Sequence, residues 1–435
     1  MRFDDSLPAF VKVIADAFGD EAISSAVFVR DAQGVLAAVL DCDLDVEMLS
    51  EIQGKARAAL GPYARAEEPV RGKNDPGAER LLNRPTSFVK VGGVNVRLID
   101  RRIVGLDWLA PPKLEGGGVP RVVFFSIKGG VGRSTALCVC AAHLARQGLR
   151  VLAIDLDFEA PGLGATLLRP EELPRYGVVD WLVENGISGI DQQFLADSIG
   201  HSSLMEGMAV LPAFGTATLN NPADALSKIA RASIEDTSQG ITKPFREQVR
   251  EMVERCEQTG DFDVVLVDAR AGLHETTAAP LLNLGAKILM FGLDEPQTFQ
   301  GYKLLLAHID ERLPDSQAWR EQAWLVQAKA PGLPDTAAGD RFRALWGDTS
   351  NVIGVEQVLS AEDLDVEWNN DETVIPLPEE PAPLLWVLDD GRYRGFDPLR
   401  SGELLSLALV NETFRTLIEW FDEEVVQAAD QKVAG

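Results

Sequence analysis

The sequence lacks the marks of a membrane-inserted, disulfide-stabilised or zinc-binding protein. No apolar run reaches about 18 residues and no signal peptide is visible, so we expect a cytoplasmic protein without a membrane span. Its four cysteines show neither metal-ligand spacing nor a disulfide framework. Its four histidines are isolated from one another, which argues against a zinc site.

Basic side chains are also scarce. The chain has 41 Lys and Arg against 67 Asp and Glu, a net charge of −26, which repels DNA and anionic lipid. Residues 55–113 are the exception, with twelve basic and six acidic side chains. Nucleic acid or an acidic partner would therefore have to bind this segment. Alternatively, the segment docks against the protein's own acidic body.

The first 109 residues predict a small α+β domain that is a candidate partner-binding unit. Apolar periodicity predicts helices over 7–18 and 46–60. Two hairpins are predicted, 26–30 with 35–40 and 88–91 with 94–99, the second turning at Gly92-Gly93. A Pro- and Gly-rich linker over 110–118 ends the domain.

Residues 119–425 alternate strands with helices, which predicts a mostly parallel α/β sheet covered by helices on both faces. Predicted strands span 121–126, 150–154, 264–267, 287–291 and 323–327. Predicted helices span 135–147, 244–256, 300–312 and an acidic stretch at 404–429. Residues 335–372 fit no such unit and are predicted to be an insertion; 426–435 form a tail.

The stretch Ser126-Ile127-Lys128-Gly129-Gly130-Val131-Gly132-Arg133-Ser134-Thr135 is a phosphate-binding loop by its residue types and its place. Its glycines let the backbone N–H groups approach phosphate oxygens between a strand and a helix N-terminus. Lys128 and Arg133 add positive charge, and the Ser134 hydroxyl is a ligand suited to Mg²⁺.

Carboxylates follow two of the predicted strands. Asp155 and Asp157 follow one and share a face if the strand continues that far, and Asp268 ends the other. Because the carboxyl ends of parallel strands form one edge where ligands bind, we expect the loop and these carboxylates to face one crevice. Carboxylates beside a triphosphate require a metal ion to offset their repulsion.

Residues 128–135 resemble the deviant Walker A motif of the ParA/MinD group of ATPases, whose usual form is K-G-G-V-G-K-[ST]-[ST]. The resemblance extends through Asp155-Leu156-Asp157 and through 261–272, and covers about residues 119–330. It is faint beyond, at Val374-Ile375-Pro376, and absent from 1–115. The Arg133 form resembles a variant branch with a K-G-G-V-G-R loop, which is associated with bacterial conflict and signalling systems.

The resemblance implies ATP and Mg²⁺ as cofactors and a role for each matching residue. Lys128 matches the signature lysine that touches the partner's phosphates in a nucleotide-sandwich homodimer. Ser134 matches the Mg²⁺ hydroxyl, Asp157 the carboxylate that positions water, and Asp268 the Walker B aspartate. The whole loop, Gly129, Gly130, Val131, Gly132, Arg133 and Thr135 included, would bind nucleotide with the second-switch Gly272, and Gln327, Lys329 and Pro376 match base-contacting positions.

Arg133 stands where the family has its ordinary Walker lysine, and a guanidinium is wider and bidentate. Three outcomes stay open at this point. Arg133 holds phosphate and permits slow hydrolysis; or it allows binding without hydrolysis; or Lys128 does the main work across a dimer.

Two functions therefore compete. The first is an ATP-binding, slowly hydrolysing dimerisation switch that acts on a protein partner. The second is a non-hydrolysing nucleotide-binding scaffold or adaptor with a degenerate loop. Membrane binding is not expected, because the apolar face of 414–426 carries acidic rather than basic neighbours.

Overall fold

The computed structural model describes residues 1–84, 86–101, 105–114, 118–187, 189–235, 243–259, 261–332, 337–346 and 384–427. These belong to two compact units, one of Met1–Leu109 with His308–Pro314, the other of Ala110–Ala307 with Asp315–Gly435. Most of the predicted insertion, the Val374-Ile375-Pro376 segment and most of the tail lie outside the described residues. Residues 337–346 of the predicted insertion form a helix.

The first unit is an α+β fold built on a sheet of strand order β3-β2-β1-β5-β4. Its strands are β1 Val27–Arg30, β2 Leu36–Val39, β3 Val70–Arg71, β4 Ser87–Val91 and β5 Val94–Asp100. Its helices are α1 Phe3–Phe18, α2 Asp20–Ser25, α3 Val46–Leu60 and α4 Ala78–Leu82, with 3₁₀ turns at Gly61–Tyr63 and Asp107–Leu109. Both predicted hairpins are antiparallel pairs, and a core that includes Phe10, Phe28 and Leu98 lies beneath α1 and α3.

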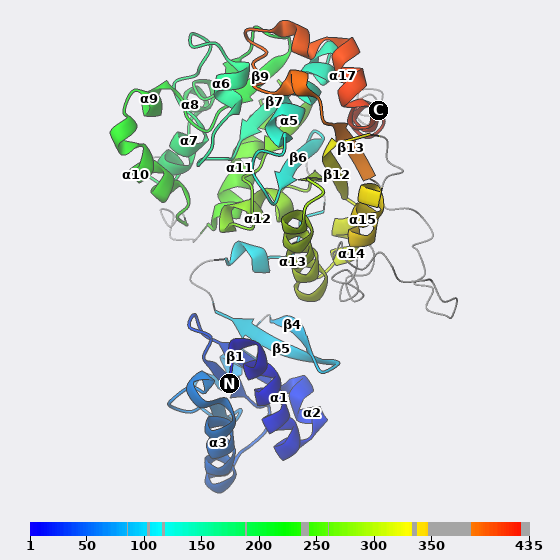
Figure 1. Ribbon diagram of the computed structural model, residues 1–435. Coiled ribbons are helices and arrows are strands. Elements are labelled where there is room, and N and C mark those ends of the chain that lie inside the picture. Colours follow the sequence, from blue (N-terminus) through cyan, green and yellow to red (C-terminus); the bar gives the residue numbers. More distant parts are fainter. Residues whose placement is uncertain are drawn as a thin grey trace, which may run out of the picture. The chain divides into compact units, whose positions relative to one another are not determined.

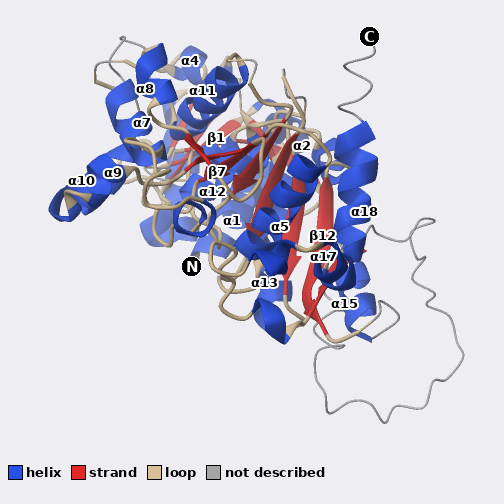
Figure 2. Cartoon of the chain, turned by 90° about the horizontal axis from the view of Figure 1, so that it is seen from above, coloured by secondary structure: helices blue, strands red, loops and turns tan. Residues whose placement is uncertain are grey.

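The second unit is a mostly parallel sheet of order β13-β12-β11-β6-β10-β7-β9-β8, with helices on both faces (Figures 1 and 2). Among the described pairs, β8 and β9 are antiparallel and the others are parallel. The strands are β6 Arg121–Ser126, β7 Val151–Asp155, β8 Gly200–His201, β9 Met208–Leu211, β10 Val264–Asp268, β11 Lys287–Gly292, β12 Ala323–Ala330 and β13 Leu384–Leu388.

The helices of the second unit follow the strands along the chain. They are α5 Arg133–Arg146, α6 Leu163–Leu167, α7 Val178–Asn185, α8 Gln192–Ala196, α9 Thr216–Leu219, α10 Pro222–Ala232, α11 Phe245–Glu257, α12 Glu275–Leu282, α13 Pro296–Arg312, α14 Ser316–Arg320, α15 Ala337–Trp346, α17 Leu407–Thr413 and α18 Arg415–Phe421. Short turns follow at Gly391–Tyr393, Gly402–Leu405 and Asp422–Val426.

The central strand β6 is buried on both faces, and its side chains alternate between two layers of helices. Phe124 stacks on Phe421 of α18 at 6.0 Å, in the core that α5 shares. Phe125 points to the other layer and meets Tyr302 of α13 edge-on at 6.0 Å. This burial explains the continuous apolar run in the sequence, because a parallel strand covered on both sides has no polar face.

Three details differ from the sequence predictions. Strand β7 ends at Asp155, so Asp157 lies beyond the strand rather than on its face. The acidic helix predicted over 404–429 is broken into separate turns and the short helices α17 and α18. Strands β3, β8, β9 and β13 were not predicted: β3 and β8 have two residues each, and β9 and β13 lie outside the strand–helix alternation recognised in the sequence.

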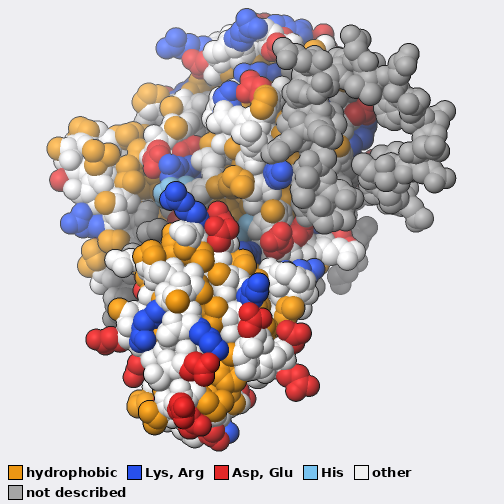
Figure 3. Space-filling view, turned by 60° about the horizontal axis from the view of Figure 1, so that its bottom comes forward, with side chains coloured by type: hydrophobic (Ala, Val, Ile, Leu, Met, Phe, Trp, Pro, Cys, Tyr) orange, Lys and Arg blue, Asp and Glu red, His pale blue; other side chains and the backbone are white. Residues whose placement is uncertain are grey.

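Several basic side chains of the first unit have partners within the same unit. Lys55 pairs with Glu51 at 2.6 Å, Lys73 pairs with Asp43 at 3.1 Å, and Arg97 donates to the carbonyls of Ser25 and Leu82. Figure 3 shows a face on which basic, acidic and apolar side chains are interspersed rather than gathered by charge. In the described part of the chain, no helix is long and apolar enough to cross a membrane.

Candidate functional site: a phosphate loop and the wall opposite it

The phosphate loop connects the end of β6 to the first turn of α5. Gly130 and Gly132 have φ of +74° and +95°, which L side chains rarely adopt. A Cβ at Gly129, Gly130 or Gly132 would meet no atom within 4 Å, so the glycines leave space above the loop backbone. Open backbone N–H groups at the N-terminus of a 14-residue helix form an anion-binding site.

Ser134 and Asp268 meet beside the loop. The Ser134 hydroxyl donates to Asp268 Oδ2 at 2.5 Å, and Asp268 ends β10, the strand next to β6. Burial raises the pKa of Asp268, although Arg133 and the Ser134 hydroxyl oppose the rise. This contact joins the loop to the second predicted carboxylate.

Arg133 turns inward, with 7% of its surface exposed. Its Nη2 donates to Asp157 at 3.1 Å, its Nη1 to Ser126 Oγ at 3.3 Å, and its Nε to Asp268. Burial acts to lower the pKa of Arg133, but the two carboxylates outweigh it and raise the pKa. The Arg133 guanidinium thus bridges Asp157, which follows β7, and Asp268, which ends β10.

Asp155 serves the adjacent loop. Its carboxylate accepts the backbone N–H groups of Asp157, Gly162 and Leu163 at 3.0–3.1 Å. Burial, with the charge of the neighbouring Asp268, raises the pKa of Asp155 to about 7. Asp155 therefore holds the segment that carries Asp157, and only Asp157 of the two lines the cavity.

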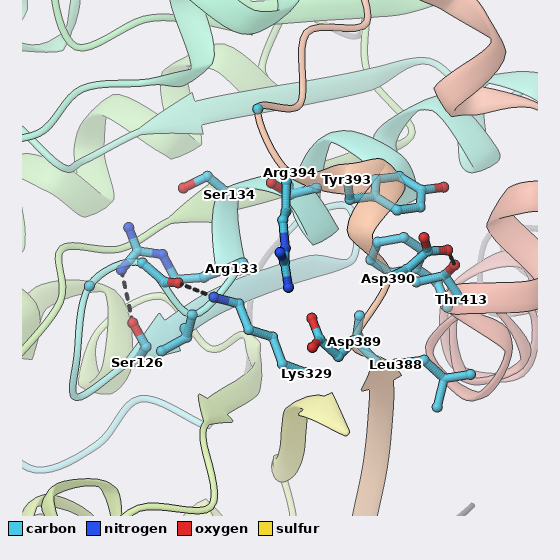
Figure 4. A pocket seen from close by; sticks show the side chains of 18 of the residues that line it. Ser126, Arg133, Ser134, Lys329, Leu388, Asp389, Asp390, Tyr393, Arg394 and Thr413 are labelled. Atoms are coloured by element: carbon cyan, nitrogen blue, oxygen red, sulfur yellow. Dashed lines mark hydrogen bonds between the residues drawn. The ribbon is translucent and has the colours of Figure 1, made fainter. Parts of the chain in front are cut away.

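A cavity of about 560 Å³ lies above the loop (Figure 4). One wall is the loop itself, with Ser126, Asp157 and Ala160. The opposite wall comes from the C-terminal part of the chain. It consists of Lys329, Val387, Leu388, Asp389, Asp390, Tyr393, Arg394, Gly395, Thr413 and Phe414.

Apart from Lys329, this opposite wall was missed by sequence reasoning. Its signal was the same one that marked Asp155 and Asp268: carboxylates directly after an apolar strand, here Asp389 and Asp390 after β13. The signal went unread because the sequence before it, at 335–372, fits no strand–helix unit.

The remaining predicted site residues occupy different places. Lys128 pairs with Glu295 at 2.6 Å and does not line the cavity. Lys329, with φ +52°, donates its Nζ to the carbonyl of Gly130 at 2.9 Å. Gln327 is buried in β12, outside the cavity lining, and Gly272, with φ +85°, donates its N–H to Ser126 at 2.9 Å. Pro376 lies outside the described residues.

The oxygen donors beside the loop fit Mg²⁺. Among the described residues, no group of three or more His, Cys, Asp or Glu side chains is arranged to hold a metal ion. Mg²⁺ commonly takes one or two protein oxygens and completes its shell with phosphates and water. The Ser134 hydroxyl and the Asp268 carboxylate supply such oxygens, while Arg133 contacts the other oxygen of Asp268.

A strand–glycine loop–helix unit in a mostly parallel sheet, with a carboxylate at the end of the neighbouring strand, defines a P-loop nucleotide-binding protein. Residues 122–313 match the family model of the CobQ/CobB/MinD/ParA nucleotide binding domain. Over these residues, which include the loop, Asp157 and Asp268, the chain is similar to a nucleotide-binding domain of this family.

The chain is also similar to solved structures at low sequence identity. A ParA family ATPase from Chlorobium tepidum TLS is 16% identical, with 70% of this chain and 99% of that chain covered and a TM-score of 0.45. The cell division ATPase MinD from Pyrococcus furiosus is 17% identical, with 70% and 98% covered and a TM-score of 0.44. MinD from Pyrococcus horikoshii OT3, complexed with Mg-ADP, is 16% identical, with 70% and 96% covered and a TM-score of 0.44. No curated protein matches the chain.

Proposed function

We propose that the chain binds ATP with Mg²⁺ in the cavity above the phosphate loop and acts as a slowly hydrolysing, ATP-dependent dimerisation switch. The observation that carries the proposal is the junction of Arg133, Ser134, Asp157 and Asp268 at the head of α5. It joins the phosphate loop to the carboxylates that a magnesium-dependent reaction requires.

Each residue has a distinct task in this proposal. The backbone of 129–135 cradles the phosphates, and the Ser134 hydroxyl and Asp268 hold Mg²⁺, which offsets the charge of the phosphates when bound. Asp157 orients a water molecule. Arg133 must leave at least one of its two carboxylates for this to happen, so its release is coupled to nucleotide binding.

Dimerisation and partner binding follow from the same assignments. Lys128 reaches the nucleotide of a second copy once it parts from Glu295, which makes the dimer a nucleotide sandwich. The 1–109 unit binds a protein partner, and its setting is a bacterial conflict or signalling system. Nucleic acid would bind only through residues 55–113, and the local pairing of Lys55, Lys73 and Arg97 weighs against it.

A second candidate is a nucleotide-binding scaffold that does not hydrolyse. It is favoured by one observation, the bridging of Asp157 and Asp268 by a buried guanidinium that is bidentate and fixed in charge. In that case, Asp157 stays paired with Arg133 when nucleotide is bound.

A nucleotide titration with size analysis and turnover measurement separates the two. ATP-dependent dimerisation with slow turnover, abolished by Asp157→Ala, supports the switch. Tight ATP binding without turnover, together with turnover gained in Arg133→Lys, supports the scaffold. Turnover that survives Asp157→Ala contradicts the role given to that carboxylate, and no nucleotide binding at all contradicts both functions.

A further inference from the structure

Both cations of the phosphate loop already have carboxylate partners within the chain. Lys128 is paired with Glu295 at 2.6 Å, and Arg133 is buried against Asp157 and Asp268. A phosphate that approaches the loop therefore meets open backbone N–H groups but little uncompensated side-chain charge. The positive charge available to it must come from the opposite wall.

The turn after β13 supplies that charge. Its geometry is fixed by Asp390, which accepts hydrogen bonds from the Arg392 backbone at 2.9 Å and from the Thr413 hydroxyl at 2.7 Å. Tyr393 adds a second anchor, because its hydroxyl donates to the Leu404 carbonyl at 3.0 Å and its ring meets Phe414 edge-on at 5.0 Å. The backbone that carries residue 394 is thus held in place before any ligand binds.

Arg394 is the side chain that this turn directs into the cavity. Its guanidinium lies in the space that Lys329 and Asp389 share, between the loop and the apolar residue Leu388 (Figure 4). Within the described residues, its guanidinium makes no hydrogen bond or ion pair. By contrast, Arg392 of the same turn is committed to Asp390 and Glu412.

We propose that Arg394 contacts the phosphate chain of the bound nucleotide from the side opposite the loop. The proposal rests on nucleotide binding in this cavity. A guanidinium offers a planar set of donors that matches phosphate oxygens. Arg394 loses little by turning to them, because its guanidinium has no partner among the residues that the structure describes. Lys329, which lies on the loop carbonyl of Gly130, contributes a second positive charge on the same side.

Asp389 lies in the same space and makes this wall more selective for ligands of high negative charge. A single carboxylate offsets part of the charge of Arg394 and Lys329, so a neutral or weakly charged ligand gains little there. A polyphosphate carries enough negative charge for its attraction to both cations to exceed its repulsion by Asp389. The wall therefore recognises the charge of the phosphate chain rather than the base.

The test measures the binding of ATP, ADP and adenosine to the full-length protein and to Arg394→Gln, Arg394→Lys and Arg400→Gln. Arg400 is a matched control, an arginine of the same segment that is 88% exposed in its side chain, pairs with Asp397 and lies outside the cavity lining. Both positions are exposed, so thermal unfolding should show that every variant folds as the wild type does.

We expect Arg394→Gln to weaken ATP and ADP binding by about tenfold, the loss typical of one charge-assisted hydrogen bond, and to leave adenosine binding unchanged. The ATP affinity of Arg394→Lys should lie between those of wild type and Arg394→Gln, and that of Arg400→Gln should equal wild type. Added salt should reduce the difference in ATP affinity between wild type and Arg394→Gln. Equal losses for adenosine and ATP would overturn the proposal, as would ATP binding unaltered in Arg394→Gln. If the wild type binds none of the three ligands, the proposed function fails together with this inference. If the wild type binds ATP and the Arg394 variants bind it equally well, this inference alone fails.

Discussion

The guanidinium of Arg133 lies 3.1 Å from the carboxylate of Asp157, and the same guanidinium also donates to Asp268. The residue that departs from the usual loop motif is therefore the counter-ion of the two carboxylates on which a magnesium-dependent reaction would depend. In the proposed function, nucleotide binding and release of this bridge are linked.

Removing the bridge should destabilise the nucleotide-free protein. Arg133→Ala leaves Asp157 and Asp268 buried side by side without a counter-ion, a change that costs about 3–5 kcal/mol for a buried pair. Chemical denaturation measures this loss. The double variant Arg133→Ala, Asp157→Asn should recover part of it, and a double variant no more stable than the single one would contradict the bridge.

Asp155 should make stability depend on pH. Burial raises its pKa from 3.8 to about 7 in the folded protein, so the folded state binds more protons than the unfolded state between these values. The free energy of unfolding therefore falls as pH rises through that window, and this contribution is retained below it. Between pH 4 and pH 7, the free energy of unfolding of Asp155→Asn should fall less steeply than that of wild type. An equal slope in the two proteins would show that other groups cause the pH dependence.

Gly301 of α13 should be intolerant of a side chain. A Cβ there would lie 2.3 Å from Cγ2 of Ile127, the residue before Lys128, so Gly301→Ala pushes the phosphate loop or the helix. We expect a loss of about 1–3 kcal/mol in stability, the usual cost of overpacking, and weaker nucleotide binding.

Gly54 provides the control for that substitution. It is also within a helix, α3, but a Cβ there meets nothing within 4 Å, so Gly54→Ala should stabilise by up to about 1 kcal/mol. Thermal unfolding of both variants separates helix propensity from packing. If both substitutions change stability in the same direction, the close approach of Ile127 is not what makes a side chain at position 301 unfavourable.

Glu295 should restrain dimerisation. The carboxylate holds Lys128 at 2.6 Å in a pair whose two side chains are about two-fifths exposed, so Glu295→Gln frees the ammonium at little cost in stability. We expect ATP-dependent dimers at a lower protein concentration, measured by sedimentation. Asp294→Asn, which breaks the neighbouring pair with Arg341 instead, should leave the dimerisation threshold unchanged.

Much of the fold was predictable because its signals are local. The apolar runs of β6 and β10 and the glycines of the loop each identify an element without reference to the rest of the chain. The hairpin turns of the first unit were equally readable, since Gly92 and Gly93 adopt positive φ as such turns require. Strand β13 was not predicted, because the sequence before it, at 335–372, fits no strand–helix unit that would mark the next strand.

The candidate site was predictable only in part. The carboxylates were found by their place after strands, but the roles of Asp155 and Asp157 were not separable. The end of β7 decides that difference, because the chain turns after Asp155 and Asp155 then accepts the N–H groups of its own loop.

By itself, the sequence determined that this chain has a phosphate loop between a buried strand and a helix, with carboxylates at the same edge of the sheet. Only the tertiary structure decided which charges are already paired. Arg133 and Asp268 are 135 residues apart, and Lys128 and Glu295 are 167 apart, so no local pattern links them. Arg394 faces the loop because the parallel strands of one sheet end at the same edge, and β13 belongs to the sheet of β6 although β12 and β11 lie between them.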